Sequence, residues 1–154
     1  GVKPVALLMT IMAPPSATED DIRQIMKDAG DAAADLEVEI AGGHTEITSA
    51  VNRIIVSTTA IGKVLKNKLV KTAGAQIGDD VIMTKYAGLE GTAILSNDKA
   101  EELKGILTEE ELMSGQALAS NISVVKEGVL AGEFGVNSMH DATEGGILGA
   151  VWEV

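Results

Sequence analysis

The sequence predicts a mixed α/β fold, and three observations support this class. Runs typical of strands alternate with stretches of helical periodicity along the chain. The apolar residues are mostly Ala, Val, Ile, Leu and Met, whereas Phe, Tyr and Trp occur once each. Such a core is built from β-branched strands packed against small-residue helices. The 17 glycines indicate many tight turns or close backbone approaches.

The net charge of −11 argues against nucleic acid or an anionic membrane as the main partner. It leaves open a phosphate-bearing small molecule, because metal ions and helix N-termini neutralise phosphates locally. The absence of cysteine excludes disulfides and a thiol nucleophile from this segment. No apolar run approaches membrane-spanning length and no signal peptide opens the sequence, so we expect a soluble, cytoplasmic protein.

The first sixty residues read as strand, helix, strand, strand. Val5–Met12 is nearly continuous apolar sequence, which suits a strand covered on both faces or one strand of a barrel-forming sheet. Helical spacing of apolar residues, with N-cap residues and three acids at the start, predicts a helix over Thr18–Leu36. Strands are predicted at Glu37–Ala41 and Arg53–Ile61.

Between the last two strands lies the sequence Gly42-Gly43-His44-Thr45-Glu46. Two glycines at the end of a buried strand let the backbone turn sharply and approach a ligand closely. Three polar side chains able to bind metal or phosphate follow directly. The alternative is an ordinary Gly-Gly turn followed by solvated polar residues.

The chain is expected to be a fragment spanning parts of two α/β domains. It begins with Gly1 rather than Met, and it stops at Val154 inside a predicted helix. Residues 63–75 are rich in lysine and read as a connection, although solvated surface lysines explain the same pattern. The predicted division is a first domain over 1–62, this linker, and part of a second domain over 76–154.

The second part is predicted to hold one strand and several helices. The strand covers Val81–Lys85, and a helical segment interrupted near Ser96–Asp98 runs over Ala93–Leu107. Thr108 and Glu111 match a capping box that starts another helix. Further helices are predicted at residues 122–132 and 147–154.

Two places in this part share the design of a strand, glycines and a helix. Thr84 and Lys85 end the first strand, with Gly88, Glu90 and Gly91 following. A second short strand is predicted to end at His140-Asp141, followed by Thr143, Gly145 and Gly146. Free amides and the positive end of a helix dipole at such turns bind anions, although turns of this kind are common in α/β folds without a ligand.

Glu46 and Asp141 are the candidate ligands for a hard cation such as Mg²⁺, which takes a few carboxylates beside waters and phosphate oxygens. His44 has three candidate roles: metal ligand, hydrogen-bond donor to phosphate, or general base. For His140, a packed histidine with satisfied hydrogen bonds is an equal alternative.

Three motifs occur in order and together resemble a known superfamily. They are Gly42–Glu46, the stretch from Gly78 to Thr92, and Met139–Gly146. The chain resembles the superfamily of aminoimidazole ribonucleotide (AIR) synthetase, selenophosphate synthetase, thiamine monophosphate kinase and the hydrogenase-maturation carbamoyl dehydratase. The likeness is greatest to the AIR synthase-related proteins of the hydrogenase-maturation branch, and it covers almost the whole chain.

The resemblance implies ATP- and Mg²⁺-dependent activation of an amide, acid or phosphate acceptor by phosphoryl transfer. It also implies two α/β domains, ATP in a cleft, and a homodimer formed by joining the sheets of the first domains into a barrel. By this likeness, His44 and Asp141 are the catalytic residues, with Glu46 and Asp141 holding the metal. The remaining assignments are nucleotide binding by Gly42, Gly43, Thr45, Thr143, Gly145 and Gly146, and substrate contact by Thr84, Lys85, Gly88, Glu90 and Gly91.

The chain departs from the superfamily at position 44, where several relatives carry Asp or Glu instead of His. We therefore keep three functions in view: an ATP-dependent enzyme whose isolated fragment is inactive, a nucleotide-binding or assembly protein without turnover, and a dimerisation scaffold. The sequence leaves the acceptor open, because function resides in the site rather than in the fold.

Overall fold

The computed structural model describes residues 1–154, which divide into two compact units. One unit is Val2–Lys66, and the other is Asn67–Val154 together with Gly1. The division falls within the predicted connection at 63–75, which contains two short 3-10 turns, η1 (Lys66–Lys68) and η2 (Thr72–Gly74). No helix in the chain is both long and apolar enough to span a bilayer.

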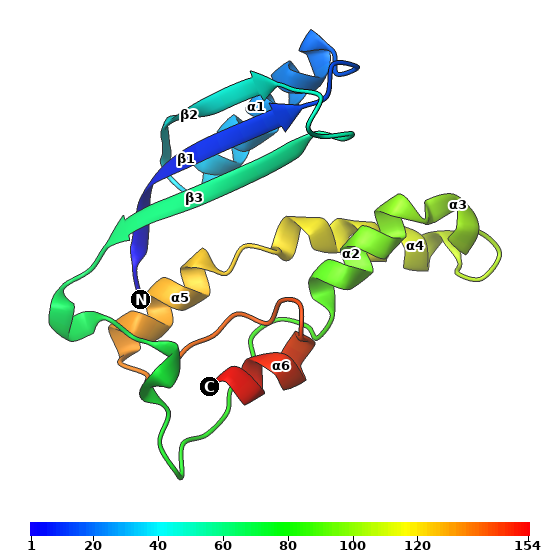
Figure 1. Ribbon diagram of the computed structural model, residues 1–154. Helices are drawn as coiled ribbons and strands as arrows, with labels where there is room; N and C mark the ends of the chain where they lie inside the picture. The colour runs from blue at the N-terminus through cyan, green and yellow to red at the C-terminus, as the bar shows by residue number, and fades with distance from the viewer. The chain divides into compact units, whose positions relative to one another are not determined.

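The unit Val2–Lys66 is a three-stranded sheet with one helix. Its elements are β1 (Lys3–Ala13), α1 (Glu19–Asp35), β2 (Glu39–Ile47) and β3 (Ile55–Lys63). The strand order is β2-β1-β3, with β2 parallel and β3 antiparallel to the central β1 (Figure 1). The predicted order of strand, helix, strand, strand and the predicted mixed α/β class are confirmed.

Helix α1 begins where the sequence predicts, because its first turn is capped. The Thr18 hydroxyl accepts from the Asp21 amide at 3.2 Å, and the Asp21 carboxylate accepts from the Thr18 amide at 2.8 Å. This reciprocal capping box satisfies two amides that lack helical partners. The Thr18 amide also lowers the pKa of Asp21, since it hydrogen-bonds the charged form.

The core of this unit lies between the sheet and α1. Met9, Ile11 and Ala13 alternate along β1 and are buried, as are Ala33 of α1 and Val38 before β2. In Figure 1 the helix lies behind the sheet and covers only this face. The opposite face, which we call the open face, is uncovered within the unit and exposes Leu8, Ile55 and Ile61 by about two fifths each. Within the unit, β1 is therefore covered on one face only.

The predicted turn at Gly42-Gly43 is wrong, because both glycines lie inside β2. Leu7 pairs with Ile40 and Leu8 pairs with Gly42, so Ala41 is an extra residue that makes a bulge. A Cβ on Gly43 would stand 1.8 Å from the carbonyl oxygen of Met9. The glycine therefore permits a close approach between two strands instead of a turn.

The second unit contains helices but no sheet. The predicted strands at Val81–Lys85 and before His140-Asp141 are wrong, since both segments are irregular. A strand needs a neighbouring backbone to pair with, and no strand of this unit lies beside either segment. Short apolar runs alone do not supply that partner.

The helices of this unit follow the sequence more closely. They are α2 (Leu89–Asp98), α3 (Ala100–Leu103), α4 (Glu109–Ala117), α5 (Val125–Phe134) and α6 (Gly146–Glu153), with a 3-10 turn η3 (Leu118–Asn121). The predicted interruption falls at Lys99 instead of residues 96–98. The predicted capping box is confirmed: the Thr108 hydroxyl accepts from the Glu111 amide, and the Glu111 carboxylate accepts from the Thr108 amide.

Helices α2 and α4 pack through small residues. A Cβ on Gly115 of α4 would stand 2.2 Å from the hydroxyl oxygen of Ser96 on α2, so the two helices approach where a glycine leaves space. The Gln116 amide donates to the Ser96 carbonyl at 3.0 Å across the same contact. Ser96 and Ala93 are the buried side chains here.

Candidate functional site

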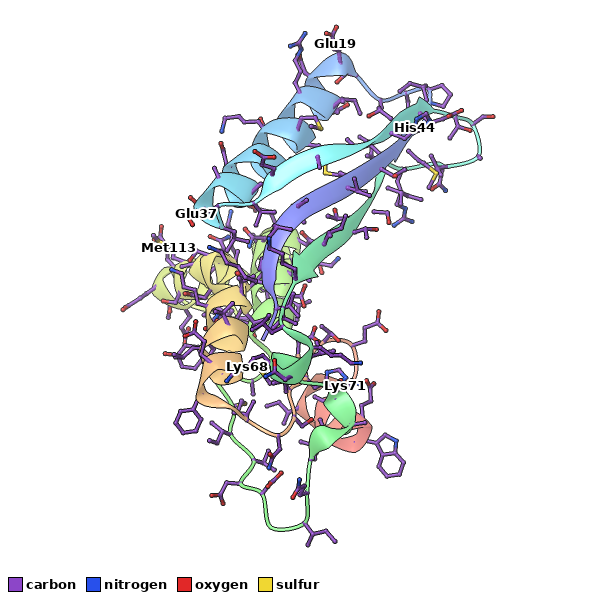
Figure 2. All side chains as sticks on the ribbon, turned by 90° about the vertical axis from the view of Figure 1, so that its left-hand side faces the viewer. Glu19, Glu37, His44, Lys68, Lys71 and Met113 are labelled. Carbon is purple, nitrogen blue, oxygen red and sulfur yellow. The ribbon has the colours of Figure 1, made fainter.

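His44 and Glu46 stand together on the open face of β2. Their Cα partners on β1 are Thr10 and Met12, which alternate with the buried residues of that strand. Because residues two apart on a strand share a face, the imidazole and the carboxylate meet, with Nε2 and Oε2 separated by 3.0 Å. Both side chains are more than half exposed, and Figure 2 shows His44 at the far end of the strand from Glu37.

The neighbouring residues of this motif have different surroundings. Thr45 pairs with Ile11, a residue of the helix-covered face, so it points away from His44 and Glu46. A Cβ on Gly42 would lie 3.8 Å from the Leu8 side chain, which places Gly42 on the open face. Of the predicted residues in this motif, the structure brings His44 and Glu46 together with the bare backbone of Gly42.

His140 bridges the segment before α6 to the end of that helix. Its Nδ1 lies 2.6 Å from the Asp141 carbonyl oxygen, and its Nε2 lies 2.5 Å from Oε2 of Glu153. Both partners are acceptors, so the doubly protonated imidazolium satisfies both. The Glu153 carboxylate, followed by the Asp141 carbonyl, raises the pKa of His140 above its ordinary value. The alternative of a satisfied histidine therefore describes this residue.

At the predicted anion site before α6, backbone atoms of Thr143 and of the two glycines form the turn. The Gly146 amide donates to the Thr143 carbonyl at 3.0 Å, which closes a turn ahead of the helix. A Cβ on Gly145 would stand 2.8 Å from the Gly149 Cα, so glycine is needed there. The Asp141 carboxylate is about three fifths exposed beside this turn.

Lys85, in the predicted substrate segment, makes hydrogen bonds and an ion pair within its own unit. Its backbone has a φ of 59°, in the left-handed region. Its ammonium donates to the carbonyls of Asn121, at 2.9 Å, and Ser123. It also lies 3.0 Å from Oε1 of Glu127, and both side chains are less than a third exposed. The ammonium is thus engaged within its own unit.

Lys85 also favours the ionised form of Glu127. The hydrogen bond from its ammonium is the main reason that the pKa of Glu127 lies below its ordinary value.

The other predicted residues of this segment lie at the start of α2. Gly88 is the left-handed N-cap with a φ of 66°, Glu90 is in the first turn, and Gly91 is inside the helix.

Asp79 is a residue whose role the sequence reading missed. Its carboxylate accepts from the Gln76 amide at 2.8 Å and from the Asn137 side chain at 2.9 and 3.0 Å. These bonds, the one from Gln76 first, lower the pKa of Asp79. Asp79 thereby ties the turn after η2 to the segment ahead of His140. The turn signal at Gly78-Asp79 was visible in the sequence, but its distant partner was not.

The candidate metal ligands are single carboxylates. No group of three or more His, Asp or Glu side chains in the chain is arranged to hold a metal ion. Glu46 and Asp141 lie in different units, so their convergence stays a prediction. The chemistry of these donors suits Mg²⁺, which binds through one or two carboxylates plus phosphate oxygens and waters.

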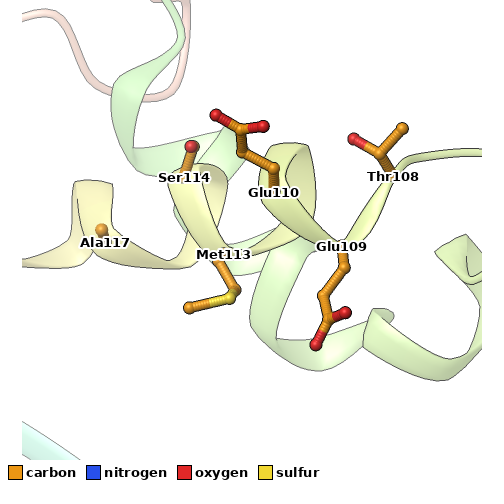
Figure 3. A pocket seen from close by; sticks show the side chains of 6 residues that line it. All are labelled: Thr108, Glu109, Glu110, Met113, Ser114 and Ala117. Atoms are coloured by element: carbon orange, nitrogen blue, oxygen red, sulfur yellow. The ribbon is translucent and has the colours of Figure 1, made fainter.

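One surface hollow lies on α4. It has a volume of about 670 Å³ and is lined by Thr108, Glu109, Glu110, Met113, Ser114 and Ala117 (Figure 3). The two carboxylates repel a phosphate, and the Thr108 hydroxyl already donates to the Glu111 carboxylate. The hollow contains none of the residues that the sequence predicts for the site.

Comparisons with known proteins identify the family. The family model of the AIR synthase related protein N-terminal domain matches residues 1–64, and that of the C-terminal domain matches residues 76–154. The chain belongs to the AIR synthase related protein family. A putative hydrogenase expression/formation protein of Methanocaldococcus jannaschii is 31% identical over the whole chain, and the match covers 44% of that protein. The carbamoyl dehydratase HypE of Cupriavidus necator is 25% identical, again over the whole chain and 42% of its own length.

Solved structures share the fold. Escherichia coli HypE, a hydrogenase maturation protein, matches with a TM-score of 0.77 over 99% of this chain and 45% of that one, at 18% identity. A ThiL protein complexed with AMPPCP and TMP matches with a TM-score of 0.72 over 90% and 42% of the two chains, at 17% identity. The AIR synthase related chain therefore spans less than half the length of the relatives it matches.

Proposed function

We propose that this chain is part of an ATP- and Mg²⁺-dependent enzyme that activates an amide, acid or phosphate acceptor by phosphoryl transfer in hydrogenase maturation. The whole-chain likeness to a hydrogenase expression/formation protein and to carbamoyl dehydratases supports the branch. We further propose a carboxamide or another small molecule as substrate. Because the chain covers less than half of these relatives, the activity is a property of the whole protein.

The observation that carries this proposal is the pairing of His44 with Glu46 on the open face. A carboxylate and an imidazole 3.0 Å apart, both reachable from solvent, combine a hard anionic ligand with a group that can hold a proton. In the proposed site, Glu46 holds Mg²⁺, which supplies charge neutralisation for the phosphates when bound. His44 orients the Glu46 carboxylate and donates to a phosphate oxygen.

Residues of the second unit complete the proposed site. Asp141 provides a second carboxylate for the metal. The Gly146 amide is held by the Thr143 carbonyl, and the amides of Ile147 and Leu148, which follow it in the first turn of α6, have no helical partner. Unpaired amides at a helix start stabilise phosphate oxygens. Thr143 closes the turn that presents them. In this proposal residues 63–75 connect the two domains, so that the 42–46 and 139–146 segments serve one nucleotide.

A second candidate function, a dimerisation scaffold, is favoured by the apolar side chains on the open face. Leu8, Ile55 and Ile61 are each about two fifths exposed there. A sheet with one uncovered apolar face gains free energy by pairing with a second sheet. We propose a homodimer on this ground, and it is compatible with either function.

The test is ATP turnover by the whole protein carrying Glu46→Ala or Asp141→Ala. We expect each change to reduce turnover at least about tenfold, since each removes a charged metal ligand. The matched control is Glu39→Ala, which removes the same side chain from the opposite end of β2. Unchanged turnover in both site variants would contradict the site.

Thermal unfolding with ATP and Mg²⁺ separates enzyme from scaffold. A nucleotide-binding protein gains about 2.7 kcal/mol at a ligand concentration a hundred times its dissociation constant. Stabilisation without any product across amide, acid and phosphate acceptors would support a binding protein that lacks turnover. If ATP and Mg²⁺ do not raise the Tm at all, the dimerisation scaffold is the remaining function.

A further inference from the structure

The loop between β2 and β3 forms a polar hollow at one end of the sheet. The hollow has a volume of about 330 Å³ and is lined by Ser49, Ala50, Val51, Asn52, Arg53 and Ile55. The loop is anchored at its start, where the Thr48 amide donates to the Ala13 carbonyl at 2.8 Å and the Thr48 hydroxyl accepts from the Ala50 amide at 3.2 Å. These two hydrogen bonds hold the start of the loop in place.

This hollow lies at the same end of the sheet as the His44–Glu46 pair. Met12 of the central strand pairs with Glu46 on one side and with Ile55 on the other. Because neighbouring strands are about 4.8 Å apart, the backbones of Glu46 and Ile55 are separated by roughly 10 Å. Arg53 precedes Ile55 by two residues, so it lies at the same end of the sheet as Glu46.

Arg53 has no acidic partner in the chain. Of the basic residues in the unit Val2–Lys66, Lys3 pairs with Glu37, Arg23 with Glu19 and Lys27 with Asp31, whereas the unpaired ones are Arg53, Lys63 and Lys66. Of these three unpaired residues, Arg53 lines the hollow in the loop between β2 and β3. Its five N–H donors remain available to an anion.

We propose that the loop at residues 48–53 binds the phosphate groups of the nucleotide, with Arg53 as the main contact. The guanidinium is a planar fork that matches two phosphate oxygens, and the charge-assisted bonds it makes are about twice as strong as neutral ones. The Asn52 amide and the Ser49 hydroxyl line the same hollow and add neutral donors. This inference rests on the proposed function and adds a phosphate-binding residue outside the three sequence motifs.

The experiment measures binding of inorganic triphosphate and of ATP, each with Mg²⁺, to the chain by calorimetry. Arg53→Gln removes the charge and the fork, Arg53→Lys keeps the charge alone, and Arg23→Gln is the control with an equal charge change on α1. We expect Arg53→Gln to weaken triphosphate binding at least about tenfold and Arg53→Lys to weaken it less, because only the fork is lost. Arg23→Gln is expected to leave the affinity within about twofold, since exposed charges at a distance are screened.

The outcomes separate this inference from the proposed function. Equal affinities for the Arg53 and Arg23 variants, with ATP still bound by the unaltered chain, would overturn the loop assignment and leave the function standing. Triphosphate binding that depends on Arg53, without any binding of ATP, would keep the loop and overturn the nucleotide site. Should Arg53→Gln fail to fold, the ratio between Arg53→Lys and the unaltered chain decides, and a ratio of one overturns the inference.

Discussion

Nε2 of His140 lies 2.5 Å from Oε2 of Glu153, which joins the segment before α6 to the last turn of that helix. The histidine is 13 residues from its partner in sequence, and its side chain is less than a fifth exposed. The contact holds the start of the 139–146 segment, which the proposed site needs, against the end of α6. It also makes the stability of this unit depend on pH.

The pH dependence has a defined sign. The pKa of folded His140 is raised above the ordinary value of 6.5 by Glu153 and the Asp141 carbonyl. The stabilisation is therefore fully present below the unfolded pKa and is lost as the pH rises through the folded pKa. We expect the Tm to fall between pH 6 and pH 9 by more in the unaltered chain than in Glu153→Gln. A ¹H NMR titration of the His140 ring checks the direction, and an apparent pKa below 6.5 would contradict it.

A second prediction concerns the two adjacent glycines of β2. Gly43→Ala places a Cβ 1.8 Å from the Met9 carbonyl oxygen, so β2 must move away from β1. We expect a loss of about 2 kcal/mol or more in the free energy of unfolding, as for other overpacked positions. Gly42→Ala is the control, because its Cβ meets Leu8 at an ordinary 3.8 Å. Urea unfolding monitors both, and equal losses would contradict the close-approach argument.

A third prediction concerns Lys85. Lys85→Met removes the partner of Glu127 and leaves the carbonyls of Asn121 and Ser123 without their donor. We expect a clear decrease in Tm, because a partly buried carboxylate loses its counter-charge. The control Lys99→Met breaks the exposed pair with Glu102 and should change little. Similar Tm values for the two variants would show that the partly buried Lys85–Glu127 pair stabilises the fold no more than the exposed Lys99–Glu102 pair.

A fourth prediction concerns the cap of α1. Thr18→Ala removes the hydroxyl that accepts from the Asp21 amide. The expected cost is about 1 kcal/mol in unfolding free energy, the usual effect of losing an N-cap. Thr18→Ser keeps the hydroxyl acceptor, so we expect its unfolding free energy to stay close to that of the unaltered chain. Chemical denaturation of the three proteins decides, and a serine variant as unstable as the alanine one would assign the effect to packing instead.

The sequence predicted the local features of the fold well. The start of α1 followed from Thr18 and the acids after it, and the start of α4 followed from Thr108 and Glu111, because a capping box is complete within four residues. The extended character of β1 followed from its apolar run. Each of these signals is contained in a short stretch of chain.

The errors concern partners that are distant in sequence. Gly43 reads as a turn residue, and only its position beside Met9 shows that it serves strand contact. Val81–Lys85 has the composition of a strand but no neighbour to pair with in its unit. Within the candidate site, His44 meets Glu46 through alternation along β2, which the expected turn at residues 42–46 left out. The pairing of Lys85 with Glu127 depends on a tertiary contact that no local pattern contains.

The bulge at Ala41 has a consequence for reading related sequences. In a regular strand Ile40 would share its side of the sheet with Gly42, His44 and Glu46, yet Ile40 pairs with Leu7 and Gly42 with Leu8. The extra residue Ala41 thus lets Ile40 face the helix while His44 and Glu46 stay on the open face. A homologue that lacks this residue keeps the same alternation in a regular strand, with its isoleucine toward the helix and its histidine and glutamate on the open face. An alignment that places the one-residue gap after His44 instead would assign the residues in between to the wrong faces.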